Sequence, residues 1–181
     1  MDTLDDHYGE VRIQTLEPLR VASFRAASQE PEHDAFAAAF DWMDQQGLSL
    51  AKNVRLFGFD VEVSPEQAQA GLRGYEVWSS PPDASRSTPE VPVKGFNGGL
   101  YAVMKVSDPF TDPFAVIPTG WQRLAQWAEA SPEYAIGGHQ WLEEHIETAD
   151  GTYLDLYLPL SIKREKTLNR EGHNVRQGFF K

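Results

Sequence analysis

The sequence predicts an α+β fold made of two copies of a β-α-β-β unit. Several segments alternate apolar and polar residues, as half-buried strands do, and two segments repeat apolar residues at helical spacing. The same order of segments occurs twice, because RVASFRAAS at 20–28 corresponds to LYAVMKVSD at 100–108. Two such units need each other to cover their apolar faces, so we expect a pseudo-twofold pair around a central ligand cleft.

The strands are predicted from this alternation and from the turns between them. The first two, at 11–16 and 20–27, are separated by Glu17-Pro18 and are expected to pair as a hairpin. A glycine inside a strand often marks a bulge or the close approach of another group, which is what we expect at Gly58. The other strands are predicted at 53–63, 74–78, 93–106, 140–146 and 153–160, with irregular segments at 64–73 and 111–118.

Each half also carries one amphipathic helix. Ser28 is the expected cap of the first helix, which begins near Pro31 and ends at Gly47, and Thr119 is the expected cap of the second. Helical spacing predicts the residues that face the core, which are Phe36, Phe40 and Met43 in the first helix and Trp121, Leu124, Trp127 and Ala128 in the second.

Length and composition indicate a single globular domain. We expect it to cover residues 1–162, with repeats at about 10–82 and 91–162, followed by a polar basic tail at 163–181. The chain has no cysteine, which excludes disulfides and thiolate metal sites. It has no apolar run long enough to cross a membrane and no signal sequence at its N-terminus, so we expect a cytoplasmic protein.

The charge distribution argues against nucleic acid as a partner. The net charge is −11, and because the tail has six Lys/Arg against two Glu, the rest of the chain carries −15. A surface this acidic repels phosphates. The five histidines show no spacing typical of metal ligands, so we expect neither a metal site nor a cofactor.

The stretch QWLEEHI at 140–146 is the strongest candidate for a functional site. Strand alternation separates Trp141, Glu143 and His145 on one face from Leu142, Glu144 and Ile146 on the other. We expect Leu142 and Ile146 to pack on the helices, and the opposite face to point into a cavity. A carboxylate among aromatic rings suits a cationic apolar ligand, because the rings attract cations and exclude water while the acid supplies charge.

Six motifs follow one another along the chain: LFGF (56–59), GYEVW (74–78), GGLYAVMKV (98–106), GWQRLAQW (120–127), WLEEH (141–145) and LDLYLPL (154–160). In this order they resemble the GyrI-like small-molecule-binding family, which is the effector-binding domain of AraC-type and MerR-type multidrug regulators. The resemblance covers about residues 10–162. It implies a duplicated fold with the ligand in the cleft between the halves. It also nominates Glu143 as the pocket glutamate, although His145 stands where the family often has a tyrosine.

The resemblance predicts a stand-alone small-molecule-binding protein, because no helix-turn-helix segment precedes the first strand. Its partner would be a small hydrophobic or cationic aromatic ligand that is apolar and flat. Glu143 would be the counter-charge, and Glu76 is a second candidate acid because it shares a strand face with Trp78. The candidate walls of the cleft are Phe57, Phe59, Trp78, Tyr101, Trp141 and His145.

Two alternatives remain open at this point. Some stand-alone members of the family hydrolyse cyclopropane-containing DNA-alkylating natural products, and GYEVW with WLEEH resembles those members. Glu143 would then be the general base, and His145 would assist it or only hydrogen bond to it. The second alternative is a protein-interaction module of the gyrase-modulating type, with a protein partner in place of a small molecule. The sequence leaves open the natural ligand, the oligomeric state, the role of the tail, and which of Glu143 and Glu144 faces the cleft.

Overall fold

The structure is a computed structural model that describes residues 4–50, 54–80 and 88–163. The predicted basic tail therefore lies, apart from Lys163, outside the described residues. A short 3₁₀ helix, η1 (Leu4–His7), precedes the strands and helices. In chain order these are β1 (Arg12–Leu16), β2 (Leu19–Ser28), α1 (Pro31–Gln45), β3 (Arg55–Val61), α2 (Pro65–Gln69), β4 (Arg73–Ser80), β5 (Val93–Phe96), β6 (Gly99–Ser107), α3 (Pro113–Ala130), β7 (Tyr134–Ile136), β8 (Leu142–Thr148) and β9 (Gly151–Ile162).

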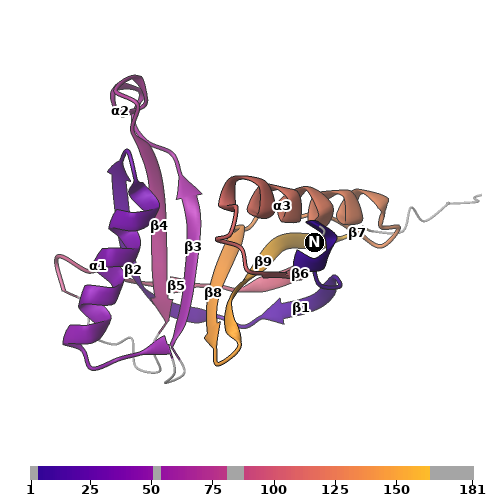
Figure 1. The fold of residues 1–181 in the computed structure, drawn as a ribbon, viewed down its shortest axis with the longest axis horizontal. Helices are drawn as coiled ribbons and strands as arrows, with labels where there is room; N and C mark the ends of the chain where they lie inside the picture. The colour runs from indigo at the N-terminus through magenta and orange to yellow at the C-terminus, as the bar shows by residue number, and fades with distance from the viewer. Residues whose placement is uncertain (1–3, 51–53, 81–87, 164–181) are drawn as a thin grey trace, which may run out of the picture.

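The predicted duplication is confirmed. The first copy is β2-α1-β3-β4 and the second is β6-α3-β8-β9. The two copies join where β3 pairs with β8 in an antiparallel register that sets Gly58 opposite Glu143. In Figure 1 the strands of the first copy run nearly upright, whereas β6 and β9 run across the view beneath α3. The fold is α+β, as the sequence predicts.

The expected hairpin between the first two strands is wrong. β1 pairs with β6, and β2 pairs with β4 and β5. Only Glu17 and Pro18 separate β1 from β2, and the proline fixes its own backbone angle and lacks an N–H group. The chain therefore continues in nearly the same direction instead of reversing. β1–β2 and β5–β6 form two long strands that pair with each other and link the two copies into one curled antiparallel sheet.

The helices differ from the prediction in three ways: α3 begins earlier, α2 is an additional short helix, and the cap of α1 is a different residue. Helix α3 begins at Pro113, with Asp112 at the N-cap position, and Pro118 lies inside it, so the predicted loop at 111–118 and the cap at Thr119 are wrong. Pro113 occupies the first turn, where a missing N–H group costs nothing. Residues 64–73 contain the short helix α2, whose Ser64 and Gln67 form a capping box. Ser28 does not cap α1, whose N-cap residue is Glu30.

The sheet has two buried faces, and their roles differ. On one face, α1 packs over Ala22, Phe24, Leu56 and Val77, and α3 packs over Met104, Val106, Leu154 and Leu156. The opposite face lies inside the curl and holds a third cluster, which includes Leu16, Phe57, Phe59, Trp78, Tyr101, Leu142 and Tyr157. Helix α1 packs mainly on β2 and β4, and α3 packs mainly on β6, β7 and β9, which leaves the junction of β3 and β8 open between them.

Most of the residues in the buried stripe of α1 are not the ones predicted from its helical spacing. The helix buries Pro31, Ala35, Ala39 and Met43, which are spaced four residues apart. Phe40 is 43% exposed, so its predicted place in the core is wrong. Phe36 lies at the edge of the stripe, beside the junction of the two copies. No helix of the described residues is long and apolar enough to cross a membrane.

Candidate functional site

A cavity of about 590 Å³ lies over the junction of β3 and β8, between the first turns of α1 and α3. Its floor is formed by strand residues, and its walls come from the two helices. Aromatic and aliphatic side chains line it, and they include Phe36, Tyr75, Phe110, Phe114, Ile117 and Leu154. The charged residues among its described lining are Glu30, Glu32, Asp60, Glu143 and Arg73. The volume and the apolar lining are typical of a small-molecule site.

Glu143 is the polar centre of this cavity. It is mostly buried, and its two carboxylate oxygens accept hydrogen bonds from neutral groups, which are the Tyr75 hydroxyl and Trp121 Nε1, each at 3.0 Å. None of the ion pairs among the described residues involves Glu143. Burial raises the pKa of Glu143 above its ordinary value, and the two hydrogen bonds only partly offset this.

Tyr75 reaches Glu143 because residue 58 is a glycine. A Cβ atom at Gly58 would lie 2.7 Å from Tyr75 Cζ, closer than real Cβ atoms approach other groups. The close approach predicted at this glycine is thus confirmed, and the approaching group is the Tyr75 ring. Burial and the neighbouring Glu143 raise the pKa of Tyr75 well above its ordinary value, so the phenol keeps the proton that it donates.

His145 lies two residues further along β8 and lines the same cavity. Its ring makes an edge contact with Phe36 at 4.3 Å between centroids and stacks against Phe110 at 5.9 Å. Burial lowers the pKa of His145 to about 4, so the imidazole is neutral at pH 7. Its Nε2 atom is buried and has no hydrogen-bond partner among the described residues.

Glu144 faces away from the cavity. Arg55 donates two hydrogen bonds to its carboxylate, both at 2.7 Å, and Tyr157 donates a third at 2.7 Å. The structure thus separates the two adjacent acids, with Glu143 on the cavity side and Glu144 in a satisfied ion pair.

The expectation that Leu142 packs on the helices is wrong, because Leu142 lies in the cluster inside the curl. The helices lie on the side of Glu143 and His145, and the cavity is the gap between them.

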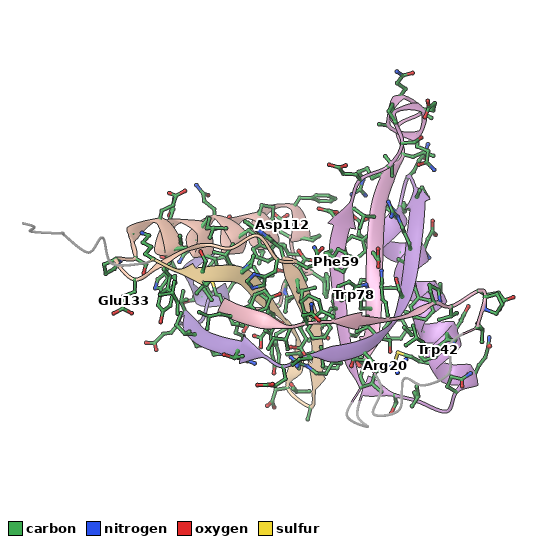
Figure 2. All side chains as sticks on the ribbon, turned by 180° about the vertical axis from the view of Figure 1, so that it is seen from behind. Arg20, Trp42, Phe59, Trp78, Asp112 and Glu133 are labelled. Carbon is green, nitrogen blue, oxygen red and sulfur yellow. The ribbon has the colours of Figure 1, made fainter. Side chains whose placement is uncertain are left out.

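Most of the other predicted wall residues lie elsewhere. Phe57, Phe59, Trp78 and Tyr101 belong to the cluster inside the curl, and Figure 2 labels Phe59 and Trp78 near the centre of the molecule. Glu76 is buried on that same side, where it accepts hydrogen bonds from Ser23, Trp78 and Lys94. Trp141 precedes β8, is 38% exposed, and packs against Trp121 at 5.2 Å between ring centroids. Of the eight predicted site residues, the structure brings Glu143 and His145 together in this cavity.

The residues that sequence reasoning missed come from segments predicted as loop or core. Phe114 falls in the segment predicted to be irregular, Phe110 lies just before that segment, and Phe36 and Trp121 were assigned to the helical core. The one available signal was GYEVW, in which strand alternation sets Tyr75 on the face opposite to Glu76 and Trp78. Among the described residues, no group of three or more His, Asp and Glu side chains is arranged to hold a metal ion.

Comparison with known proteins agrees with this geometry. The sequence matches Cass2, the family of integron-associated effector binding proteins, over residues 12–160. The chain belongs to this family. The matched residues include both copies of the repeat, and the family is GyrI-like, so the resemblance drawn from the six motifs is confirmed. The protein is accordingly an effector-binding domain that takes a small molecule. No protein of curated function matches the sequence.

Solved structures show the same fold as this effector-binding domain. The C-terminal domain of EcmrR has a TM-score of 0.60 and 13% identity, with 84% of this chain and 97% of that domain covered. An integron cassette protein from Vibrio cholerae has a TM-score of 0.50 and 12% identity, covering 86% of this chain and 98% of that one. In an EcmrR–DNA complex, the match has a TM-score of 0.61 and 13% identity, and covers 85% of this chain. This chain spans 57% of the length of that EcmrR chain.

Proposed function

We propose that this effector-binding domain holds a flat, apolar and positively charged small molecule in the cavity between α1 and α3, with Glu143 as its counter-charge. The observation that carries the proposal is the pairing of Glu143, whose carboxylate has, among the residues that the structure describes, only the neutral donors Tyr75 and Trp121 as partners. Burying a carboxylate without an opposite charge costs free energy. A bound cation would supply that charge. Burial raises the pKa of Glu143, and a cation beside the carboxylate would favour its ionised form.

The electrostatic balance of the lining supports a cation over an anion. The described lining has four carboxylates against Arg73, which is already paired with Glu32. The first turns of α1 and α3 border the cavity, and a helix N-terminus carries roughly half a positive charge. Two such termini and one guanidinium together supply roughly two positive charges, so the negative side prevails. The faces of Phe36, Phe110 and Phe114 would add cation–π attraction.

A matched pair of probes tests this proposal. 1-Methylquinolinium and 1-methylnaphthalene have nearly the same shape, and only the first carries a charge. We expect the cation to bind more tightly in calorimetric titration. We expect Glu143→Gln to weaken binding of the cation about tenfold or more, because removing one partner of a buried charge pair typically causes a loss of affinity of at least this size. Binding of the neutral probe should not change. Glu129→Gln makes the same substitution at an exposed position near the end of α3 and should leave both affinities unchanged. Equal affinity for the two probes in the wild-type protein would contradict the proposal.

One observation favours a second candidate function, the hydrolysis of cyclopropane-bearing alkylating compounds. The raised pKa of Glu143 suits a general base, and Tyr75 lies within hydrogen-bond reach of the same carboxylate. In such a reaction the carboxylate would take a proton from water while the water oxygen bonds to a cyclopropane carbon. One C–C bond of that ring would break, its electron pair would pass to the other carbon or to a conjugated oxygen, and the proton held by Glu143 would then be delivered to that atom. Incubation with a cyclopropane-bearing alkylator, followed by mass spectrometry, distinguishes the two functions. A product heavier by one water that disappears with Glu143→Gln means hydrolysis, whereas stabilisation without a change in mass means binding.

A further inference from the structure

Among the described residues, His145 differs from the other partly buried histidines in having no hydrogen-bond partner. His7 Nδ1 lies 2.7 Å from the carbonyl oxygen of Ser107, and His139 Nε2 lies 3.0 Å from that of Leu100. No hydrogen bond among the described residues involves either ring nitrogen of His145, and its Nε2 atom is shielded from solvent. A buried polar group without a partner costs about 1–3 kcal/mol. The fold therefore tolerates a cost at this ring that it avoids at the other two.

The side chains that pack against the His145 ring and its neighbours in register are apolar, whereas Glu143 lies two residues away on the same strand face. Its strand neighbours in register are Leu56 of β3 and Leu154 of β9. Phe36 of α1 contacts the ring with its edge, and Phe110 stacks over it from the segment before α3. These contacts hold the imidazole in place without satisfying its nitrogens, so an unpaired polar group lies beneath Phe110 at the wall of the cavity.

Phe110 is the exposed member of this arrangement. It is 54% exposed, and it stands in the short segment between β6 and α3. A ligand that displaced Phe110 would disturb little of the core and would uncover the His145 ring. Phe114, which is 91% exposed on the first turn of α3, lies on the same side of the cavity and would gain cover from the same ligand.

We infer that His145 is a second polar anchor of the cavity, and that the ligand carries a hydrogen-bonding group such as a hydroxyl or carbonyl in addition to its cationic aromatic body. A neutral imidazole offers one donor and one acceptor, so it can pair with either kind of group. It also adds no positive charge beside Glu143 that would oppose a cation. The inference rests on the proposed function, and it narrows the ligand class from flat cations in general to those with a polar substituent.

The test compares hydroxymethyl and ethyl substituents at the same ring position of 1-methylquinolinium, for several positions in turn. The two substituents have similar size, and an apolar cavity without a polar anchor would favour ethyl. In the wild-type protein we expect at least one hydroxymethyl isomer to bind about 2- to 10-fold more tightly than its ethyl partner, the range that one hydrogen bond supplies. His145→Phe keeps an aromatic ring in place but removes both ring nitrogens, so it should reverse that preference.

His33→Phe is the matched control, because His33 lines the same cavity from the exposed side of α1 and should keep the hydroxymethyl preference. A second readout needs no variant: nitrogen chemical shifts of the His145 imidazole should move with the hydroxymethyl probe and stay in place with the ethyl probe. A hydroxymethyl preference that is absent at every position, or that persists in His145→Phe, overturns the inference and leaves the proposed function intact. Failure of every cation to bind overturns both.

Discussion

The hydroxyl of Tyr75 reaches Glu143 by crossing the backbone of Gly58, where no side chain has room. Gly58 lies opposite Glu143 in the pairing of β3 with β8 and opposite Val77 in the pairing of β3 with β4. The glycine thus lies at the junction of the two copies. Tyr75 of the first copy fills the space above it and donates a hydrogen bond to Glu143 of the second copy.

The first prediction concerns this space. Gly58→Ala places a methyl group 2.7 Å from Tyr75 Cζ, so the ring must move away from Glu143. We expect a loss of about 1–3 kcal/mol in the free energy of unfolding, as for an overpacked core, together with weaker binding of 1-methylquinolinium. Chemical denaturation and calorimetry measure the two effects. Gly95→Ala in β5 is the matched control, because a Cβ atom there meets nothing within 4 Å. Equal stability of the two variants would show that Tyr75 is not held where the structure has it.

The second prediction separates the two adjacent acids. Glu144→Gln weakens the pairing with Arg55 and Tyr157 on the side away from the cavity. We expect it to lower the free energy of unfolding by about 2 kcal/mol, between the values for exposed and buried ion pairs, because Arg55 is partly exposed. Affinity for the cationic probe should not change at a temperature where the variant is fully folded. A loss of affinity without a loss of stability would place Glu144, and not Glu143, at the ligand.

The third prediction follows from the raised pKa of Glu143. A bound cation favours the ionised carboxylate, so the affinity for 1-methylquinolinium should be full well above the pKa of Glu143 and should fall as the pH drops through it. Because burial raises that pKa, the fall should be centred above the ordinary value of 4.5. Because Glu30, Glu32 and Asp60 also line the cavity, the relevant quantity is the difference in the pH dependence of affinity between wild type and Glu143→Gln. Parallel pH profiles for the two proteins would be inconsistent with Glu143 as the counter-charge.

The fourth prediction concerns stability and His145. Its pKa is about 4 in the folded protein and 6.5 when unperturbed, so the unfolded chain binds more protons between these values. Stability is therefore lost as the pH falls from about 6.5 to 4, by about 3 kcal/mol for a shift of this size. His145→Phe should remove that part of the pH dependence, measured as the free energy of unfolding by urea at pH 7 and pH 4. An unchanged difference between the two pH values would show that the imidazole is not buried in its neutral form.

The periodic signals in the sequence predicted the repeated unit well. Alternation located the strands that carry Gly58 and Glu143, and it set Glu143 and His145 on one face. Local signals failed where a proline was taken as a boundary. Pro18 separates two strands that continue in line, and Pro113 and Pro118 lie inside α3. In each case the tertiary partners, β6 for the first strand and the sheet under α3, stabilise a conformation that the local sequence does not reveal.

The sequence by itself determined the duplicated β-α-β-β order, the family, and the placement of Glu143 and His145 on one strand face. These features depend on periodicity and residue type along single segments. Only the tertiary structure decided which aromatic residues surround that acid. Trp78 and Phe59 are near in sequence to Tyr75 and Gly58, but strand alternation puts them on the opposite face of the sheet, and the packing of the two helices decided which face carries the cavity. The cavity is formed where two helices from different copies leave the β3–β8 junction uncovered, and the position of that gap depends on contacts between residues more than 80 positions apart, such as Gly58 and Glu143.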